Sequence, residues 1–199
     1  MENFFDFTKL QGDTCTIIPL SYEHHDELSE AVADGELCKL WYTFAPDPQK
    51  MQDNIALRLK LKQDGTMLPF TVVDNKTHKA IGMTTYLNMD KENRRVEIGG
   101  TWYRKSAQRT GINTECKLLL LTHAFESMNC IAVEFRTHAL NHQSRQGIER
   151  LGAKLDGVLR NNMIMPDGTF RDTYVYSIIV SEWPTIKTHL TFLKGKYRA

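Results

Sequence analysis

The stretch that most constrains the fold is residues 94–128, because it reads as a strand, a polar loop and a helix in immediate succession. Val96, Ile98 and Trp102 stand two or four residues apart, as apolar residues do on one face of a strand. From Ile112 onward the spacing changes to three and four, which is typical of an amphipathic helix. The recurring residues are Leu118, Leu121, Phe125 and Met128. The pattern therefore predicts a helix packed on a sheet, as in α/β proteins.

The loop inside this stretch, residues 103–113, is polar and basic and carries one glycine near its end. The first backbone N–H groups of a helix have no partner within the helix, and the helix dipole adds partial positive charge there. Gly111 would let the main chain approach a phosphate closely, and Arg104, Lys105 and Arg109 supply positive charge. The loop is a candidate anion site, although many strand-to-helix loops share these features.

The rest of the chain alternates short apolar runs, amphipathic stretches and turn residues. Strands are expected at 14–19, 70–73, 79–89, 94–103, 131–136, 155–160 and 173–180. Helices are expected at 22–34, from 47 to near 65, at 112–128, 141–152 and 185–194, with Ser21, Asp47 and Asn141 as N-caps. No internal repeat or flexible linker interrupts this order, so residues 1–199 are expected to form one domain.

Composition excludes several classes of protein. The 25 basic and 24 acidic residues leave a net charge of +1, which argues against a protein that coats nucleic acid. The cysteines form no CxxC pair and no cluster with histidine, so we expect free thiols and no metal site. They are Cys15, Cys38, Cys116 and Cys130. Residues 1–6 carry acids and no long apolar run, so we expect no signal peptide, and because no stretch has the length of a membrane span a cytoplasmic location is expected.

Residues 108–113 resemble the pyrophosphate loop of the GNAT N-acetyltransferases, whose motif is Gln/Arg-x-x-Gly-x-Gly/Ala. Gln108 and Gly111 match this motif, whereas Asn113 stands where a small residue is usual. A second match covers residues 141–183, from an Asn after the fifth strand to a Glu-Trp pair. Its spacing resembles the RimJ/RimL-like branch, which contains the ribosomal-protein-alanine N-acetyltransferases.

The resemblance implies an α/β GNAT fold. Its central sheet would be mixed, mostly antiparallel and of about six to seven strands, flanked by helices and splayed at the acyl-CoA site. The implied activity is transfer of an acetyl group from acetyl-CoA to a primary amine by direct attack in a ternary complex. The acceptor would be a protein N-terminus or a small amine such as an amino acid, polyamine or drug. A non-catalytic acyl-CoA-binding regulatory module is a further alternative, and a homodimer is compatible with each.

The resemblance also implies which residues bind acetyl-CoA. Backbone groups of the central strand and of the loop would hold the carbonyl and the pyrophosphate, and Asn141 would steady the pantetheine arm. The implied residues are Thr101, Trp102, Tyr103, Gln108, Arg109, Thr110, Gly111, Ile112, Asn113, Thr114, Asn141 and Arg145. Asn141 can fill this role and also cap its helix.

The catalytic residues follow the family pattern only in part. Many GNAT enzymes place a tyrosine seven residues after the Asn, where this chain has Ile148, which cannot donate a proton. Ser144 is the remaining hydroxyl on that helix, and Rim-type enzymes place a serine there. Because serine is a far weaker acid than a thiol, we interpret Ser144 as a hydrogen-bond donor to the developing thiolate, or as a relay. Glu97 on the central strand is the first candidate for the general base, and His138, expected just past the fifth strand, is the second.

Residues 40–46 form an aromatic segment without a clear period between the first two helices. The segment can fill the core, or Trp41, Tyr42 and Phe44 can form one wall of the acceptor cleft. A closed aromatic pocket would favour a small-molecule acceptor, whereas a broad trench lined by acids would favour a basic peptide.

Overall fold

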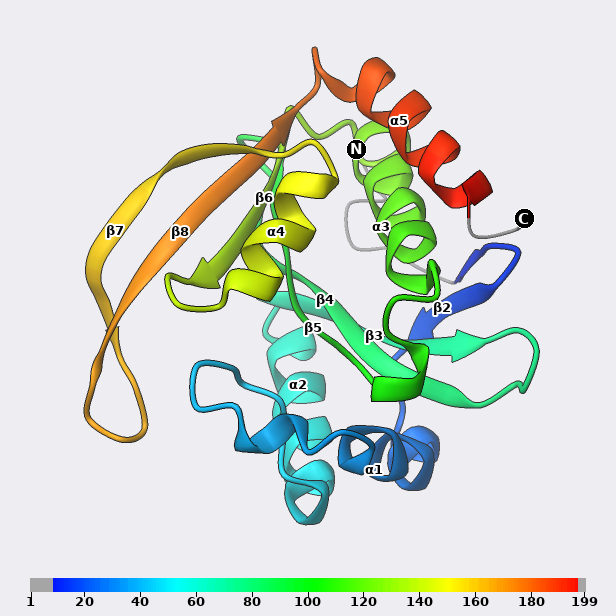
Figure 1. Cartoon of the computed structure of the whole chain (residues 1–199), viewed down its shortest axis with the longest axis vertical. Helices are drawn as coiled ribbons and strands as arrows, with labels where there is room; N and C mark the ends of the chain where they lie inside the picture. The colour runs from blue at the N-terminus through cyan, green and yellow to red at the C-terminus, as the bar shows by residue number, and fades with distance from the viewer. Residues whose placement is uncertain (1–8, 197–199) are drawn as a thin grey trace.

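The computed structural model describes residues 9–196, which form one mixed sheet of eight strands in the order β1-β2-β3-β4-β5-β6-β8-β7 (Figure 1). Only β5 and β6 pair in parallel; the other neighbours are antiparallel. The strands are β1 Leu10–Gln11, β2 Cys15–Pro19, β3 Met67–Asp74, β4 Ala80–Asp90, β5 Arg95–Tyr103, β6 Ala132–His138, β7 Lys154–Ile164 and β8 Phe170–Ile179. The mixed, mostly antiparallel sheet is confirmed, with eight strands in place of six to seven.

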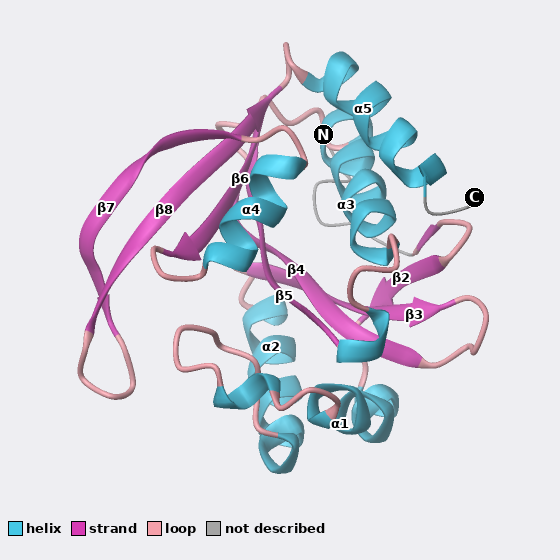
Figure 2. Ribbon diagram, in the orientation of Figure 1, coloured by secondary structure: helices cyan, strands magenta, loops and turns pink. Residues whose placement is uncertain are grey.

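Helices cover both faces of this sheet. α1 and α2 pack on one face, and α3, α4 and α5 pack on the other (Figures 1 and 2). The helices are α1 His25–Ala33, α2 Met51–Gln63, α3 Ile112–Thr122, α4 His142–Arg150 and α5 Trp183–Lys196. α3 ends earlier than its apolar pattern predicts, because a π-helical turn, His123–Ser127, follows it.

The three expected N-caps are confirmed. The side chain of Ser21 accepts a hydrogen bond from a backbone N–H of the 3-10 turn Tyr22–His24 that leads into α1. Asp47 does the same for the turn before α2, and Asn141 does so for α4. A side-chain acceptor satisfies one of the backbone donors that every helix start leaves unpaired, so these short polar residues fix where each helix begins.

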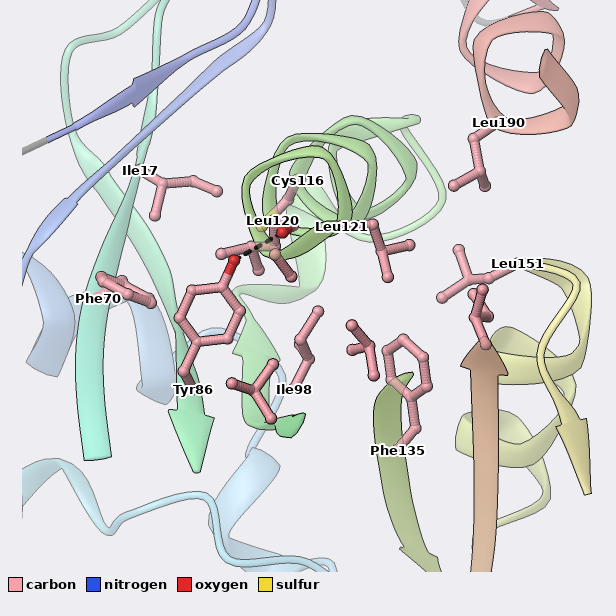
Figure 3. Close-up of a cluster of buried hydrophobic side chains, with 14 of the residues drawn as sticks. Ile17, Phe70, Tyr86, Ile98, Cys116, Leu120, Leu121, Phe135, Leu151 and Leu190 are labelled. Atoms are coloured by element: carbon pink, nitrogen blue, oxygen red, sulfur yellow. Dashed lines mark hydrogen bonds between the residues drawn. The ribbon is translucent and has the colours of Figure 1, made fainter. Parts of the chain in front are cut away.

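The larger core lies between the sheet and α3 (Figure 3). Phe70 and Tyr86 come from adjacent strands and meet Leu120 of the helix. The Tyr86 hydroxyl donates to the Leu120 carbonyl oxygen at 2.6 Å, which satisfies the one polar atom of this buried ring. Burial of each such side chain contributes about 1.5–3 kcal/mol, so α3 is held rigidly against the strands.

The sheet is interrupted at its centre, where β5 and β6 part. Their parallel pairing covers three residue pairs and ends at Glu97, opposite Glu134. β5 also carries a bulge opposite Thr84, and Gly100 there takes a left-handed φ of 57° that glycine adopts without strain. The rest of β5 and of β6 therefore face each other without pairing, as the resemblance implied.

Candidate acyl-transfer site

The loop that leads into α3 leaves the start of this helix open. Gly111 occupies the N-cap position with a φ of 92°, and no side chain caps the helix. The loop is instead held by its own contacts. The Gln108 side-chain amide donates to the Tyr103 carbonyl oxygen at 3.0 Å, and the Thr110 hydroxyl donates to the Ala107 carbonyl oxygen at 2.6 Å. The first N–H groups of α3 are thus presented at a fixed position to an anion.

The basic residues of this loop have separate surroundings. Arg104, which we expected to supply charge at the anion site, points to α1, where it lies 3.2 Å from Asp34 and 3.6 Å from Glu30. Arg109 has a left-handed φ of 62° and forms no ion pair with a residue in the range 9–196. Arg104 is thus engaged elsewhere, whereas Arg150 of α4 donates to the Thr114 hydroxyl in the first turn of α3 at 3.0 Å and brings a positive charge that the loop itself does not contain.

The side chains of Thr101, Trp102 and Tyr103 are all engaged in packing. The Thr101 hydroxyl lies 2.7 Å from the Lys117 ammonium, Trp102 belongs to the smaller core under α1 and α2, and Tyr103 belongs to the larger core. A ligand between the parted strands would therefore meet the backbone groups of these residues.

The residues predicted to bind the cofactor or the thiolate at the start of α4 have different surroundings. The Asn141 side chain accepts from the Ser144 backbone N–H at 3.0 Å, and the half-buried Ser144 hydroxyl has no hydrogen bond to a described residue. The Arg145 guanidinium lies 3.9 Å from the centre of the Tyr174 ring and donates to the Tyr176 hydroxyl. Arg145 is thus held against β8. Its contact with a cofactor stays a prediction.

Glu97 lies at the fork of β5 and β6. Because Val96 and Ile98 face the larger core, Glu97 points to the opposite face of the sheet. Its carboxylate is only 6% exposed, accepts a hydrogen bond of 2.7 Å from the Asn88 amide and lies 3.6 Å from Arg136. Burial raises the pKa of Glu97, although the Asn88 hydrogen bond and Arg136 act against this. A raised pKa makes this carboxylate a stronger base.

His138 is the last residue of β6 and does not lie beyond it, which corrects the expected end of the strand at 136. The strand is longer because β6 pairs with β8 as far as His138 opposite Thr173. The His138 Nδ1 accepts from the Leu140 backbone N–H at 3.0 Å, while its buried Nε2 has no hydrogen-bond partner among residues 9–196. Burial, with the charge of Arg171, lowers the pKa of His138, so the ring is neutral at neutral pH.

The aromatic segment between α1 and α2 does not fill the core. Trp41 is 49% exposed and Phe44 is 50% exposed. The ring of Trp41 lies 5.1 Å from that of His138, with Tyr42 beside both, and Phe44 lies beneath the guanidinium of Arg171. The segment therefore lies against the end of β6 and the start of β8 and does not plug the core; that it forms a wall of the acceptor cleft stays a prediction.

We call the surface of β5, β6 and β8 that points away from α3 the polar face. It is defined by Glu97, Glu134, Arg136, His138, Arg171 and Thr173. A hollow of about 110 Å³ adjoins Glu97 on this face. The hollow is lined by Asn88, Asp90, Arg95, Val96, Glu97, Glu134 and Arg136. Acids and arginines alternate around it, so the face is not a trench lined by acids.

Besides Arg150, three basic side chains near the site were not singled out from the sequence. Arg58 of α2 donates to Thr85 next to the bulge, and Arg171 of β8 is 8% exposed. Lys117 of α3 is 5% exposed, and burial lowers its pKa to about 8. Lys117 could have been found from the sequence, because it is a lysine inside the apolar run of α3. The arginines carry no local signal, because only the packing of distant elements brings Arg58 to Thr85 and Arg171 toward Glu97.

Other kinds of site are not seen in the described part of the chain. The four cysteines are free, and burial raises the pKa of Cys116, in keeping with packing. Within residues 9–196, His, Cys, Asp and Glu form no group of three or more that could hold a metal ion. No helix in this range combines the length and apolarity needed to cross a membrane.

Comparison with known proteins decides the family. The family model described as "Acetyltransferase (GNAT) domain" matches residues 15–154, which include the open start of α3 and Glu97. The chain belongs to the GNAT acetyltransferases. Members of this family use acetyl-CoA as acetyl donor. The GNAT member described here falls in the RimJ/RimL-like branch.

Individual relatives support this placement. The Bacillus subtilis protein named "Putative ribosomal N-acetyltransferase YdaF" is 33% identical over 102 residues, which are 51% of this chain and 55% of that protein. The crystal structure of a GCN5-related N-acetyltransferase from Brucella melitensis superposes with a TM-score of 0.83 at 26% identity, covering 94% of this chain and 86% of that one. The ribosomal-protein-S5-alanine acetyltransferase from Vibrio fischeri shares the fold, with a TM-score of 0.71 at 15% identity over 89% of this chain and 99% of that one.

Proposed function

We propose that this GNAT member transfers the acetyl group of acetyl-CoA to a primary amine by direct attack within a ternary complex, in a single domain spanning residues 1–199. The observation that carries the proposal is the position of Glu97. This buried carboxylate stands where two parallel strands part, and the open start of α3 follows on the same strand's loop. A base and an anion-binding helix terminus are therefore joined by one continuous stretch of chain.

The chemistry assigns a task to each group. The N–H groups at the start of α3 bind the pyrophosphate, and unpaired backbone groups of β5 hold the acyl chain. Glu97 takes the proton from the acceptor, whose nitrogen attacks the thioester carbonyl carbon while the C–S bond breaks. The thiolate leaves with a hydrogen bond from Ser144 and takes a proton from solvent. His138 at the end of β6 is the second candidate for the base; its Nδ1 lone pair already accepts from the Leu140 N–H, so it would take a proton only by giving up that hydrogen bond.

The name of the Bacillus subtilis relative supports a protein N-terminus as acceptor, and a small amine is the alternative. The test is a panel of N-terminal peptides and small amines, incubated with acetyl-CoA and the full chain, with released thiol as the readout. Acetylation of a peptide N-terminus in preference to the small amines would support the first acceptor class. The reverse order would select the second, and no thiol release with any amine would refute the proposal.

Two matched variants test the role of Glu97. Glu97→Gln removes the base and is expected to lower kcat about 10²–10⁴-fold. Glu134→Gln makes the same change in the residue directly opposite on β6, which already pairs with Arg95 and Arg136, and should retain most of the activity. Equal losses in both variants would mean that Glu97 acts only through the charge balance of the polar face.

A further inference from the structure

The ion pairs on and around the polar face leave one arginine, Arg171, outside them. Arg95 lies 2.5 Å from Glu134, and Arg136 lies 3.0 Å from Glu134 and 3.6 Å from Glu97. Both carboxylates are therefore already matched by arginines. Arg171 adds a further positive charge to this face and forms no ion pair with any carboxylate in residues 9–196.

The Arg171 side chain is held in place by two contacts, but its terminal nitrogens donate no hydrogen bond to a described residue. Its Nε donates to the Thr173 hydroxyl at 3.0 Å, and its guanidinium carbon lies 5.6 Å from the centre of the Phe44 ring. The two terminal amino groups have no acceptor among the described residues, and neither is sealed off from the surface. Such a planar fork matches the two oxygens of a carboxylate or phosphate.

Arg171 lies beside the groups that would receive the acceptor. It stands on β8 two residues before Thr173, which pairs with His138 of β6, and its charge lowers the pKa of Glu97 and of His138. Burial of a cation without a partner costs free energy, and an anion that arrives with the ligand offsets this cost on binding. Arg58, which donates to Thr85 beside the bulge of β5, is another guanidinium without a carboxylate partner in residues 9–196, and two such arginines disfavour a basic peptide.

We infer that Arg171, seated on Phe44 and oriented by Thr173, is an anion subsite that binds a carboxylate or phosphate group carried by the acceptor amine. This inference rests on the proposed function, because it specifies which amines the same site takes. An acceptor of this kind bears its anionic group close to the amine, as an amino acid, a phosphorylated amine or a peptide with an acidic residue near its N-terminus does.

The test uses pairs of acceptors that differ in one anionic group. The pairs are alanine and alaninamide, phosphoethanolamine and ethanolamine, and the amides of alanyl-aspartate and alanyl-asparagine. For the full chain with acetyl-CoA, we expect the anionic member of at least one pair to be favoured about tenfold or more in kcat/KM. The pair that shows the preference identifies the source of the anion.

Variants then assign the preference to Arg171. Arg171→Gln should abolish the preference, read as the ratio of kcat/KM for the two members of a pair, because a changed pKa of Glu97 affects both members alike and cancels in that ratio. Arg95→Gln removes an arginine of the same face that already has Glu134 as partner, and should keep the preference. Arg171→Lys keeps the charge without the fork. It should keep part of the preference, and it replaces the glutamine variant if that one does not fold.

Binding without turnover separates this inference from the proposed function. Each pair is titrated calorimetrically into the protein saturated with coenzyme A. Tighter binding of an anionic member, lost in Arg171→Gln, supports the subsite even if no acetyl group is transferred. The inference is wrong if neither turnover nor binding favours the anionic member of any pair. It is also wrong if the preference persists in Arg171→Gln, or if that variant loses activity equally for both members of a pair.

Discussion

Replacing Lys117 by methionine removes a buried charge and keeps a side chain of similar length. The ammonium is hydrogen-bonded to the hydroxyls of Thr101 and Thr84 and pairs with no carboxylate in the described residues. The two hydroxyls also lie 2.8 Å from each other, so they keep a partner when the ammonium is gone. Lys117→Met therefore leaves no orphaned polar group and isolates the effect of the charge.

The magnitude follows from the pKa of Lys117. Burial lowers this pKa from 10.5 to about 8, which corresponds to about 3 kcal/mol of unfavourable free energy for the charged form. Below pH 8 the folded and unfolded chains both hold the proton, and the cost is fully present. Between pH 8 and 10.5 the folded chain releases the proton while the unfolded chain keeps it, so Lys117 makes the wild-type stability rise with pH.

The assay is urea unfolding of both proteins at pH 7 and pH 10, followed by tryptophan fluorescence. Lys117→Met should be the more stable protein at pH 7, and its advantage should shrink by about 2–3 kcal/mol at pH 10. Lys62→Met on the exposed side of α2 is the control, and its difference from wild type should not change with pH in this way. A constant gap between wild type and Lys117→Met would refute the reasoning, because Lys117 would then carry no shifted proton.

Three further results are expected. Acetyl-CoA at about 100 times its Kd should stabilise the fold by about 2.7 kcal/mol, seen as a higher Tm; Gly111→Asp should abolish this rise with an unchanged circular dichroism spectrum, and retained affinity would place the phosphate elsewhere. Ser144→Ala should lower kcat about ten- to hundredfold with little change in the Kd of acetyl-CoA, and an unaltered kcat where chemistry limits turnover would remove Ser144 from the mechanism. Because burial raises the pKa of Glu97, and because the base acts when deprotonated, kcat/KM should rise with pH through that pKa; an identical rise in Glu97→Gln would assign it to another group.

Local patterns explain why much of the fold could be predicted from the sequence. The apolar spacing of β5 and α3 and the capping side chains of Ser21 and Asn141 act within a few residues of where they stand. The end of β6 was placed too early, because His138 belongs to the strand through its pairing with Thr173, about 35 residues further along the chain.

The candidate site was predictable only where one chain segment builds it. The loop to Gly111 and the position of Glu97 before it lie in a single stretch, and their motif could be read directly. The contacts of Arg171 with Phe44 and its closeness to Glu97 join three distant parts of the chain. Such neighbours follow from sheet order and side-chain alternation, which no local pattern reveals.

The parting of β5 from β6 gives this protein two strand edges in its interior. An edge with free N–H and C=O groups normally invites a strand from another molecule, and proteins shield such edges. Here helices cover both faces of the sheet, so we expect a narrow chain-like ligand at these edges in preference to a polypeptide strand with side chains. The amide-bearing arm of coenzyme A is such a chain. At the site that we propose, the acetyl donor would bind by β-augmentation, as a substitute strand that completes the sheet, and we expect backbone groups of β5 and β6 to become protected from hydrogen exchange when it binds.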